Sequence, residues 1–504
     1  MNAILPNTSP ANANTETRAT IPGLSLALLL AGTLLVGFSM GRWLAPLAAW
    51  IGPALILRYA RDHKGWRGYP LVLAAWILAV FIGFGAFFNP PTGPFIVVGN
   101  GLLMSLPYLA DRLMFARLKG FSSTLAFPLA ATTLEFFFIH TNPVGTWGGT
   151  GFTQYGNLPL MQLVSVTGTI GITFLMGWFA SVANWTWENR GRGGETLKGL
   201  AAFGTVLAVV FIFGFVRLNL APSSATIRVA GITAQSLNTL AERLSGMSDP
   251  AAIQQEVLAH WEAYYDETVR EAKAGAQVIV WPEVSGAVDA EWGVDVASLV
   301  VRAQEVARQY GIYLAVPLYT RSADKTQPYE NKLLLIDPTG AIVLDHIKYG
   351  AAIMEPGRRV GDGKLQTVAT PFGVLSAVIC YDLDFPAVVQ QSGRNGTGLM
   401  LVPSKDWLEI DPIHSYMAVF RAIENGMSLV RQTDAGLSIA VDPYGRVLAQ
   451  TDYFGSTDRT MVAQVPTRHV ATLYTAFGRW FEWLCLFGFL VVVARALLAR
   501  RQVN

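Results

Sequence analysis

Residues 374–382 read Val-Leu-Ser-Ala-Val-Ile-Cys-Tyr-Asp, an apolar run that ends at Cys380. A short run of this kind predicts a buried β-strand. Two other strand-like runs also end at a polar side chain: Val-Ile-Val-Trp-Pro leads to Glu283, and Ile-Val-Leu-Asp-His-Ile leads to Lys348. In open α/β sheets, ligands gather outside the carboxyl ends of the strands. The pattern therefore predicts that these three side chains converge at one edge of a sheet.

The surrounding region alternates strand-like and helical segments. Asp-Pro-Thr-Gly at 337–340 and Asp-Pro-Tyr-Gly at 442–445 predict turns between paired strands. The strand candidates are 227–233, 277–281, 312–318, 331–337, 341–345, 374–380, 398–403, 428–433 and 437–442, and the helix candidates are 249–274, 293–310 and 411–426. This alternation predicts an α/β sandwich over residues 218–478, long enough for a substantial core.

The rest of the chain is unusually apolar. The 504 residues are 52% hydrophobic and 14% charged, whereas a soluble protein carries charges at about a quarter of its positions. Several nearly uncharged segments approach the ~20 residues that cross a bilayer. The segments are 22–39, 43–57, 70–88, 94–111, 121–139, 160–186, 197–216 and 480–499. They predict a polytopic α-helical membrane domain of eight spans, of which the second is the shortest, after a polar leader at 1–21 that lacks the pattern of a cleaved signal peptide.

The orientation follows from the basic residues, because Lys and Arg are enriched in cytoplasmic loops. Loops 89–93 and 140–159 contain no Lys or Arg, and Arg42 is the only basic residue in a loop assigned to the outside. The other loops and the tail contain Arg58, Arg61, Lys64, Arg67, Arg112, Arg117, Lys119, Arg190, Arg192, Lys198, Arg495, Arg500 and Arg501. The alternation predicts that both termini lie inside and the α/β domain outside.

Three domains follow from this topology: 1–217 with the leader and seven spans, 218–478 outside the membrane, and 479–504 with the last span and the tail. The outer loop 140–159, rich in Gly and aromatic residues, contains Trp147. It is either part of a substrate entrance at the membrane surface or an ordinary interfacial aromatic belt. Glu135 lies near the outer end of the fifth span, where an ionisable group requires a partner or a cavity.

The three converging side chains suit one chemistry. A thiolate at Cys380 attacks an acyl carbonyl once a carboxylate such as Glu283 has removed its proton. The cation of Lys348 stabilises the resulting oxyanion. Taken singly, each residue has a simpler interpretation: a cysteine packed in the core, a surface lysine, and an ion-pair partner. Cys485, the other cysteine, lies in the last apolar segment, so no disulfide is expected.

Several longer motifs resemble the nitrilase superfamily. They include Trp281-Pro282-Glu283 and Ile379-Cys380-Tyr381-Asp382, with Lys348 between them in the Glu–Lys–Cys order of that superfamily. Further matches are Phe385-Pro386, Arg421-Ala-Ile-Glu-Asn-Gly426, Arg431-Gln-Thr-Asp-Ala-Gly-Leu-Ser438 and Asp442-Pro-Tyr-Gly-Arg-Val-Leu448. Seven spans before such a domain and one after it, together with Thr472-Leu-Tyr-Thr-Ala-Phe-Gly-Arg-Trp480, resemble the apolipoprotein N-acyltransferases in particular.

This resemblance implies an αββα sandwich and an acyltransferase with a Glu283, Lys348 and Cys380 triad. The cysteine is expected to take an acyl chain from a phospholipid as a thioester and to pass it to the amino-terminal cysteine of a diacylated lipoprotein. The expected location is the inner (plasma) membrane of a bacterium, with the catalytic domain on the periplasmic side. The mechanism requires no cofactor, no metal-binding motif is present in the sequence, and the net charge of +2 predicts no nucleic-acid partner.

The segment after Lys348 departs from the acyltransferase pattern, which has a long arm there. Glu355 lies seven residues after Lys348, where the family's supporting glutamate usually lies eight. It either supports the lysine or only precedes the Pro356-Gly357 turn. Tyr381, Asp382 (in place of the usual Glu) and Trp147 are further supporting or substrate-binding candidates. The short arm leaves two alternatives open: a membrane-anchored amidase or hydrolase with water as acceptor, and a catalytically inactive scaffold.

Overall fold

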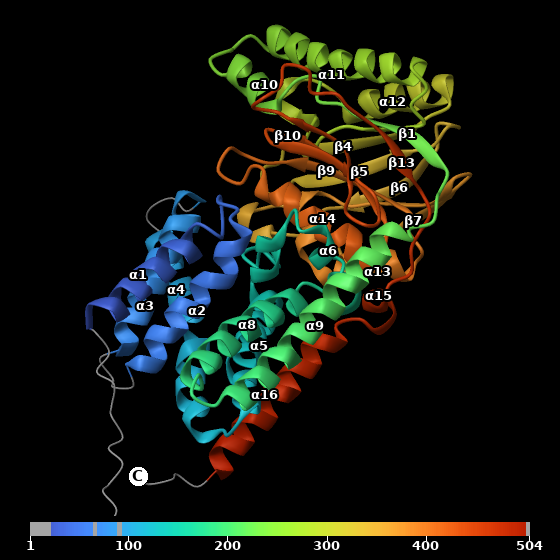
Figure 1. The fold of residues 1–504 in the computed structure, drawn as a ribbon. Coiled ribbons are helices and arrows are strands. Elements are labelled where there is room, and N and C mark those ends of the chain that lie inside the picture. Colours follow the sequence, from blue (N-terminus) through green and yellow to red (C-terminus); the bar gives the residue numbers. More distant parts are fainter. Residues whose placement is uncertain (1–21, 64–67, 88–92, 500–504) are drawn as a thin grey trace, which may run out of the picture.

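The computed structural model describes residues 22–63, 68–87 and 93–499, which form a helical part and an α/β domain (Figure 1). The expected leader at 1–21, Lys64 and Arg67, most of the loop 89–93, and Arg500 and Arg501 lie outside the described residues. The described helices of the helical part are α1 (Pro22–Gly37), α2 (Pro46–Asp62), α3 (Tyr69–Phe84), α4 (Gly93–Met114), α5 (Ala126–Thr141), α6 (Leu158–Met161), α7 (Val164–Thr167), α8 (Ile170–Glu188), α9 (Gly193–Asn219) and α16 (Trp480–Leu498).

Within the described ranges, five helical stretches are long and apolar enough to cross a membrane. They are Tyr69–Phe87, Gly93–Arg117, Phe121–Thr141, Gly193–Asn219 and Trp480–Leu498. Each coincides with a span expected from the sequence. Five of the eight expected spans are therefore candidates by length and composition.

The three remaining segments differ from simple spans. The segment expected at 160–186 is bent by 116° between Leu158–Thr167 and Ile170–Glu188, and it adds a sixth span only if the pair counts as one. The chain turns at Gly168, whose φ of 68° is a conformation that glycine adopts readily. Helix α1 has only 16 residues. Helix α2 continues to Asp62 and so includes Arg58 and Arg61, which pair with nearby carboxylates.

The α/β domain contains two packed sheets (Figure 1). The first has the order β13-β1-β2-β4-β5-β6, with β3 paired to β4, and the second has the order β12-β11-β10-β9-β8-β7. The strands are β1 (Thr226–Gly231), β2 (Val278–Val280), β3 (Gly286–Asp289), β4 (Tyr313–Arg321), β5 (Glu330–Ile336), β6 (Ile342–Ile347), β7 (Thr367–Thr370), β8 (Gly373–Ala377), β9 (Leu399–Lys405), β10 (Ser428–Asp434), β11 (Leu437–Val441), β12 (Val447–Asp452) and β13 (Met461–Pro466). The two expected turns join the antiparallel pairs β5–β6 and β11–β12.

Helices cover both outer faces of the paired sheets, as Figure 1 shows. On the first sheet lie α10 (Leu237–Leu244), α11 (Pro250–Lys273) and α12 (Val296–Tyr310). On the second lie α13 (Pro386–Arg394) and α14 (Ile413–Asn425), followed by α15 (Leu473–Phe477). The layers are helix, sheet, sheet and helix, which is the expected arrangement.

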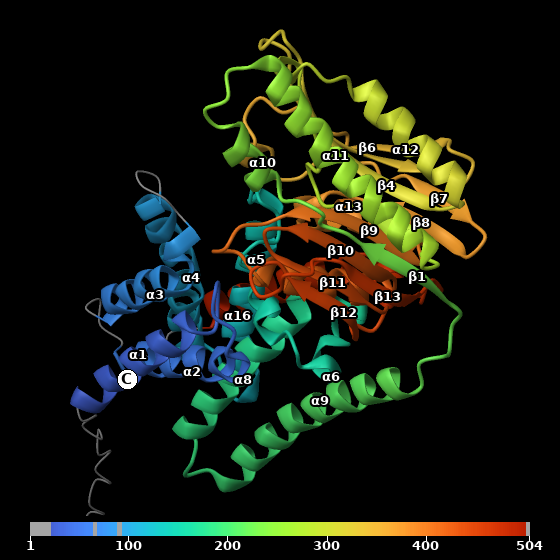
Figure 2. The ribbon, with the colours of Figure 1, turned by 90° about the horizontal axis from the view of Figure 1, so that it is seen from above.

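The helical part packs against the α14 face of the domain. The ring of Phe152, in the turn η5 (Thr150–Gln154), lies 5.2 Å from that of Phe420, and Tyr155 stacks on Tyr416 at 3.8 Å. Figure 2 shows α1–α4 gathered on one side of the domain, while α9 passes the other edge and leads into β1. One continuous hydrophobic core includes residues of both parts. Residues 145–154 of the loop 140–159 are therefore largely buried between the helical part and the domain. The loop also supplies a partner of Glu135, whose Oε1 accepts the Thr150 N–H at 3.2 Å.

Candidate active site

Cys380 lies in a tight turn rather than at the end of a strand. Strand β8 ends at Ala377, and Cys380 begins the 3₁₀ turn η8 (Cys380–Asp384) with φ of 46°. The Asp382 carboxylate accepts the Ile379 N–H at 3.0 Å, which turns the chain out of the strand direction. A left-handed conformation at a non-glycine residue is costly and is often found at active sites. The predicted strand over 374–380 is therefore wrong in its last residues, because the Asp382 carboxylate, and not a neighbouring strand, accepts the Ile379 N–H.

Glu283 and Lys348 meet in the interior, as the sequence predicts. Both are 3% exposed, and Lys348 Nζ lies 2.6 Å from Glu283 Oε1. The same oxygen accepts Asn331 Nδ2 at 2.7 Å. Burial alone would lower the pKa of Lys348, but the adjacent Glu283, Cys380 and Glu355 outweigh it and raise that pKa. The lysine is therefore a cation at neutral pH.

The backbone of Lys405 connects Cys380 to this pair. Its N–H donates to Glu283 Oε2 at 3.1 Å, and its carbonyl oxygen lies 3.8 Å from Cys380 Sγ. Burial and the charge of Glu283 raise the pKa of Cys380, while His414 and Lys348 act in the opposite direction. The cysteine is thus a thiol at neutral pH and requires a base to become a nucleophile. Cys380 therefore adjoins the Glu283–Lys348 pair through the Lys405 backbone.

Glu355 lies beside the lysine, which the sequence left undecided. It follows the turn η7 (Ala352–Met354), and its Oε1 accepts a hydrogen bond from Lys348 Nζ. Its Oε2 lies 3.0 Å from Arg358 Nε and accepts Asn331 Nδ2 at 3.3 Å. The Lys348 ammonium is therefore held between two carboxylates, although Glu355 is one residue closer in sequence than the resemblance implies.

Asp382 has a structural role in the site and does not line an open pocket. It is fully buried, and its Oδ2 lies 2.6 Å from His346 Nε2. Its Oδ1 accepts the Tyr349 and Gly350 N–H groups at 2.9 and 2.6 Å. Since these residues follow Lys348 directly, Asp382 fixes the turn of the cysteine to the segment of the lysine.

A cavity of about 700 Å³ lies between the helical part and the domain; Tyr381 and Met354, the chain neighbours of Cys380 and Glu355, line it, whereas Cys380, Glu283 and Lys348 do not. Its mostly apolar wall combines side chains of α1–α5, of the loop after α5 and of the domain. Both Tyr381 and Trp147 line it, with ring centroids 5.9 Å apart, and Ile353 and Trp407 contribute from the domain. The two aromatic candidates therefore lie where an apolar ligand between the helical part and the domain would meet the site.

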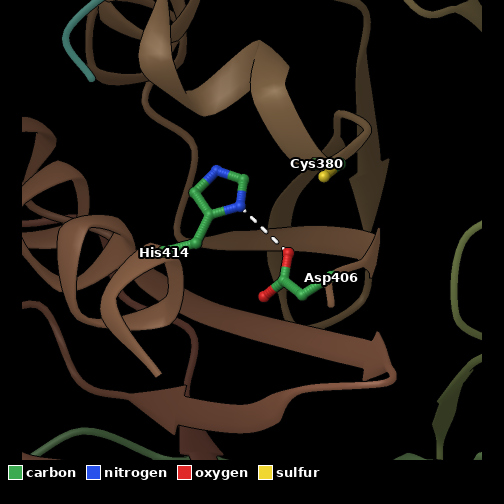
Figure 3. A group of neighbouring side chains, drawn as sticks. All are labelled: Cys380, Asp406 and His414. Carbon is green, nitrogen blue, oxygen red and sulfur yellow. Dashed lines mark hydrogen bonds and ion pairs between the residues drawn. The ribbon is translucent and has the colours of Figure 1, made fainter. Parts of the chain in front are cut away.

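One buried cluster escaped the sequence analysis. His414 and Asp406 lie beside Cys380, as Figure 3 shows, with ligand-type atoms of the three within 4.8 Å of one another. By distance alone the trio could hold a metal ion. However, Arg431 donates to both Asp406 oxygens at 2.8 Å, and both ring nitrogens of His414 face carboxylates. Since the Asp406 oxygens already accept from the Arg431 guanidinium and both His414 nitrogens already face carboxylates, an ion-pair network explains this trio better than a cation site. The sequence carries no signal for this cluster, because Asp406 and His414 lie in a mixed segment and meet Cys380 only in the folded domain.

The α/β domain resembles the carbon–nitrogen hydrolases, and it is attached to helices of which five are candidate membrane spans. Residues 233–473 match the family model of carbon-nitrogen hydrolases. Over nearly its whole length the chain resembles the apolipoprotein N-acyltransferases. It is 26% identical to that of Geobacter metallireducens, across 94% of this chain and 95% of that protein. It is 25% identical to that of Agrobacterium fabrum, across 92% and 86%. A nitrilase-superfamily amidase from Nesterenkonia AN1 aligns with a TM-score of 0.40 and 22% identity, across 52% of this chain and 97% of that one.

Proposed function

We propose that the protein transfers a fatty acyl group from a phospholipid to the amino-terminal amine of a diacylated lipoprotein, through a thioester on Cys380. The observation that carries this proposal is that the buried Glu283, Lys348 and Cys380 lie close to an apolar cavity of about 700 Å³, which is lined by Tyr381, the residue after Cys380. Withdrawing an acyl chain from lipid costs about 0.8 kcal/mol per CH₂. A cavity walled by membrane helices can bury the acyl chain as well as the lipid does. The relatives, which are named apolipoprotein N-acyltransferases, support a lipoprotein as the acceptor.

In the first half-reaction, Glu283 accepts the proton of the Cys380 thiol and the sulfur attacks the ester carbonyl carbon of the phospholipid. The ammonium of Lys348 stabilises the oxyanion of the tetrahedral intermediate. The ester C–O bond then breaks, and the departing lysophospholipid oxygen takes the proton from Glu283. The acyl group remains on sulfur as a thioester.

In the second half-reaction, the lipoprotein amine attacks the thioester carbonyl and gives up a proton to Glu283. Lys348 again stabilises the oxyanion, the C–S bond breaks, and the cysteine sulfur recovers the proton. The product is an amide. Glu355 accepts a hydrogen bond from the Lys348 ammonium in both steps and helps to keep that cation in place. Glu283 therefore remains available for proton transfer.

We infer eight crossings, with 1–217 containing seven, 218–478 on the periplasmic side of a bacterial inner membrane, and 479–504 containing the last. Five candidate spans and the bent pair are supported by length and composition. The remaining two crossings are α1, which is short, and α2, which has basic residues near its end. These two helices pack together as a hairpin. The alternation of basic and neutral loops supports the orientation.

Hydrolysis is the second candidate. The segment between Lys348 and Pro356 is short, and its Ile353 is 65% exposed. A short arm covers the thioester less completely than a long one, which favours water as acceptor. Membrane anchoring and the resemblance over the whole chain favour the lipoprotein.

Intact-mass analysis of the purified protein with a phospholipid of defined chain length tests both. We expect a mass increase of one acyl group, present in Cys485→Ser and absent in Cys380→Ser. Loss of the adduct only after addition of a diacylated lipopeptide identifies the transferase. Loss in buffer alone identifies the hydrolase. If no adduct forms in the folded wild type, the thioester mechanism is wrong and the inactive scaffold is favoured.

A further inference from the structure

His414, the second residue of α14, lies between two acidic side chains in the interior. It is 2% exposed. Its Nε2 lies 2.8 Å from Asp384 Oδ2, and its Nδ1 lies 3.0 Å from Asp406 Oδ1. An imidazole ring donates from both nitrogens only when it is protonated. The two carboxylate neighbours therefore favour an imidazolium that joins them.

The two carboxylates belong to the two segments that build the reactive centre. Asp384 is the last residue of η8, the turn that begins with Cys380. Asp406 follows Lys405, whose backbone contacts both Cys380 Sγ and Glu283. His414 thus bridges the turn of the nucleophile to the end of β9, which holds the predicted base.

The charges around His414 come from several elements. Arg431 of β10 is fully buried, donates to both oxygens of Asp406, and places Nη2 2.9 Å from His414 Nδ1. Burial and Arg431 would lower the pKa of His414, but Asp384 and Asp406 outweigh them and raise it well above its usual value. The network therefore contains two cations and two carboxylates, with Cys380 beside them and the Glu283–Lys348 pair connected through Lys405.

The outer loop of the helical part holds the same turn from the other side. Thr146 donates its N–H to the Asp384 carbonyl at 2.8 Å, and the Trp147 ring lies 5.2 Å from the imidazole. A Cβ at Gly145 would lie 2.1 Å from the Asp384 carbonyl oxygen, so only glycine allows this approach. The turn of the nucleophile is therefore fixed between α14 and the loop that lines the cavity.

We propose that His414 is a positioning residue: it clamps η8 to the end of β9 through Asp384 and Asp406 and thereby sets the approach of Cys380 to Glu283. In this role it acts through Asp384 and Asp406 and not on the substrate. The inference rests on the proposed function for its rate measurement, because misplacing a reacting group by 1 Å can cost about 100-fold in rate.

The first experiment is a double-mutant cycle on single-turnover formation of the acyl-enzyme from phospholipid. We expect His414→Gln and Asp384→Ala each to lower the maximal rate by about 10- to 100-fold, with half-saturation by the donor nearly unchanged. Because both changes break one link, the double variant should be no slower than the slower single variant. Asp384→Asn keeps an oxygen acceptor and should recover most of the rate. Effects that multiply in the double variant would overturn the clamp.

The second experiment needs no acyl donor. The pH dependence of Cys380 alkylation by iodoacetamide, followed by mass on the peptide that contains it, reports the thiol directly. Loss of the adjacent imidazolium in His414→Gln should move the alkylation midpoint to higher pH. His469→Gln should leave it in place, because the His469 ring contacts the Asn425 carbonyl at the far end of α14. An unchanged midpoint in a His414→Gln protein with a normal melting curve contradicts the proposal. If wild type forms no acyl adduct but this shift is observed, the proposed function fails, while the placement of the His414 imidazolium beside Cys380 stands.

Discussion

Lys348 Nζ lies 2.6 Å from Glu283 Oε1, and both side chains are withdrawn from solvent. The two residues are 65 positions apart in the chain. Their contact, together with Glu355 on the other side of the lysine, fixes a cation without exposing it to water. A buried charge is tolerated only when it is paired and hydrogen-bonded, so the arrangement makes the lysine a fixed source of positive potential beside Cys380.

Lys348→Ala should slow acyl-enzyme formation by about 100- to 1,000-fold, which is the usual cost of removing one oxyanion-stabilising donor. Donor binding should change little, because the apolar cavity provides it. Single-turnover rates at several phospholipid concentrations separate the two effects. Lys364→Ala is the matched control, since that side chain is 84% exposed. An unchanged maximal rate in Lys348→Ala would remove its assigned role.

Glu355→Gln tests the second carboxylate. A hydrogen bond to a charged group contributes about 1.5–3 kcal/mol, so the rate of acylation should fall by roughly 10- to 100-fold. Glu330→Gln provides the control, because its carboxylate pairs with the half-exposed Arg359 outside the site, and exposed pairs contribute little. Equal rates for Glu355→Gln and wild type would show that Glu355 only precedes the turn.

Asp382 should make the domain sensitive to acid. Burial would raise its pKa, but the bonds from His346 and from the backbone N–H groups of Gly350 and Ile379 lower it below the usual 3.8. A carboxyl group with a lowered folded pKa stabilises the fold above its unfolded pKa, and this contribution is lost as the pH falls through the folded value.

Melting temperatures measured from about pH 7 to about pH 3 should therefore fall below about pH 4, and less steeply in Asp382→Asn than in wild type. The variant should also melt lower at neutral pH, because a neutral amide forms weaker bonds to His346. Parallel curves for the two proteins would contradict this assignment.

The inferred topology predicts cleavage from the outside. Lys325, 67% exposed in the loop after β4, should be cut by trypsin added to the periplasmic face of intact spheroplasts. Arg190, in the short loop between α8 and α9, should be cut only in inverted vesicles. Immunoblots with tags at the two ends identify the fragments. Protection of Lys325 in spheroplasts would reverse the orientation.

The positions of most elements could be predicted from the sequence, because they depend on local patterns. The helices 249–274, 293–310 and 411–426 were expected within three residues of α11, α12 and α14. The bend at Gly168 could not be predicted. At the bend, Glu424 of α14 accepts the Thr169 N–H at 3.1 Å, and although Gly168 interrupts the apolar run, nothing in the run indicates that contact.

The sequence by itself determined which residue types are available and roughly where they lie: apolar runs of membrane length, strand ends at Glu283 and Lys348, and a lone cysteine in the α/β domain. Only the tertiary structure decided that Glu355 reaches the lysine and that His414 joins Asp384 to Asp406. Hydrophobic periodicity reports the burial of a segment against its surroundings. It is silent on which buried charges pair across segments, because that choice depends on distances of a few ångström set by the packing of the whole domain.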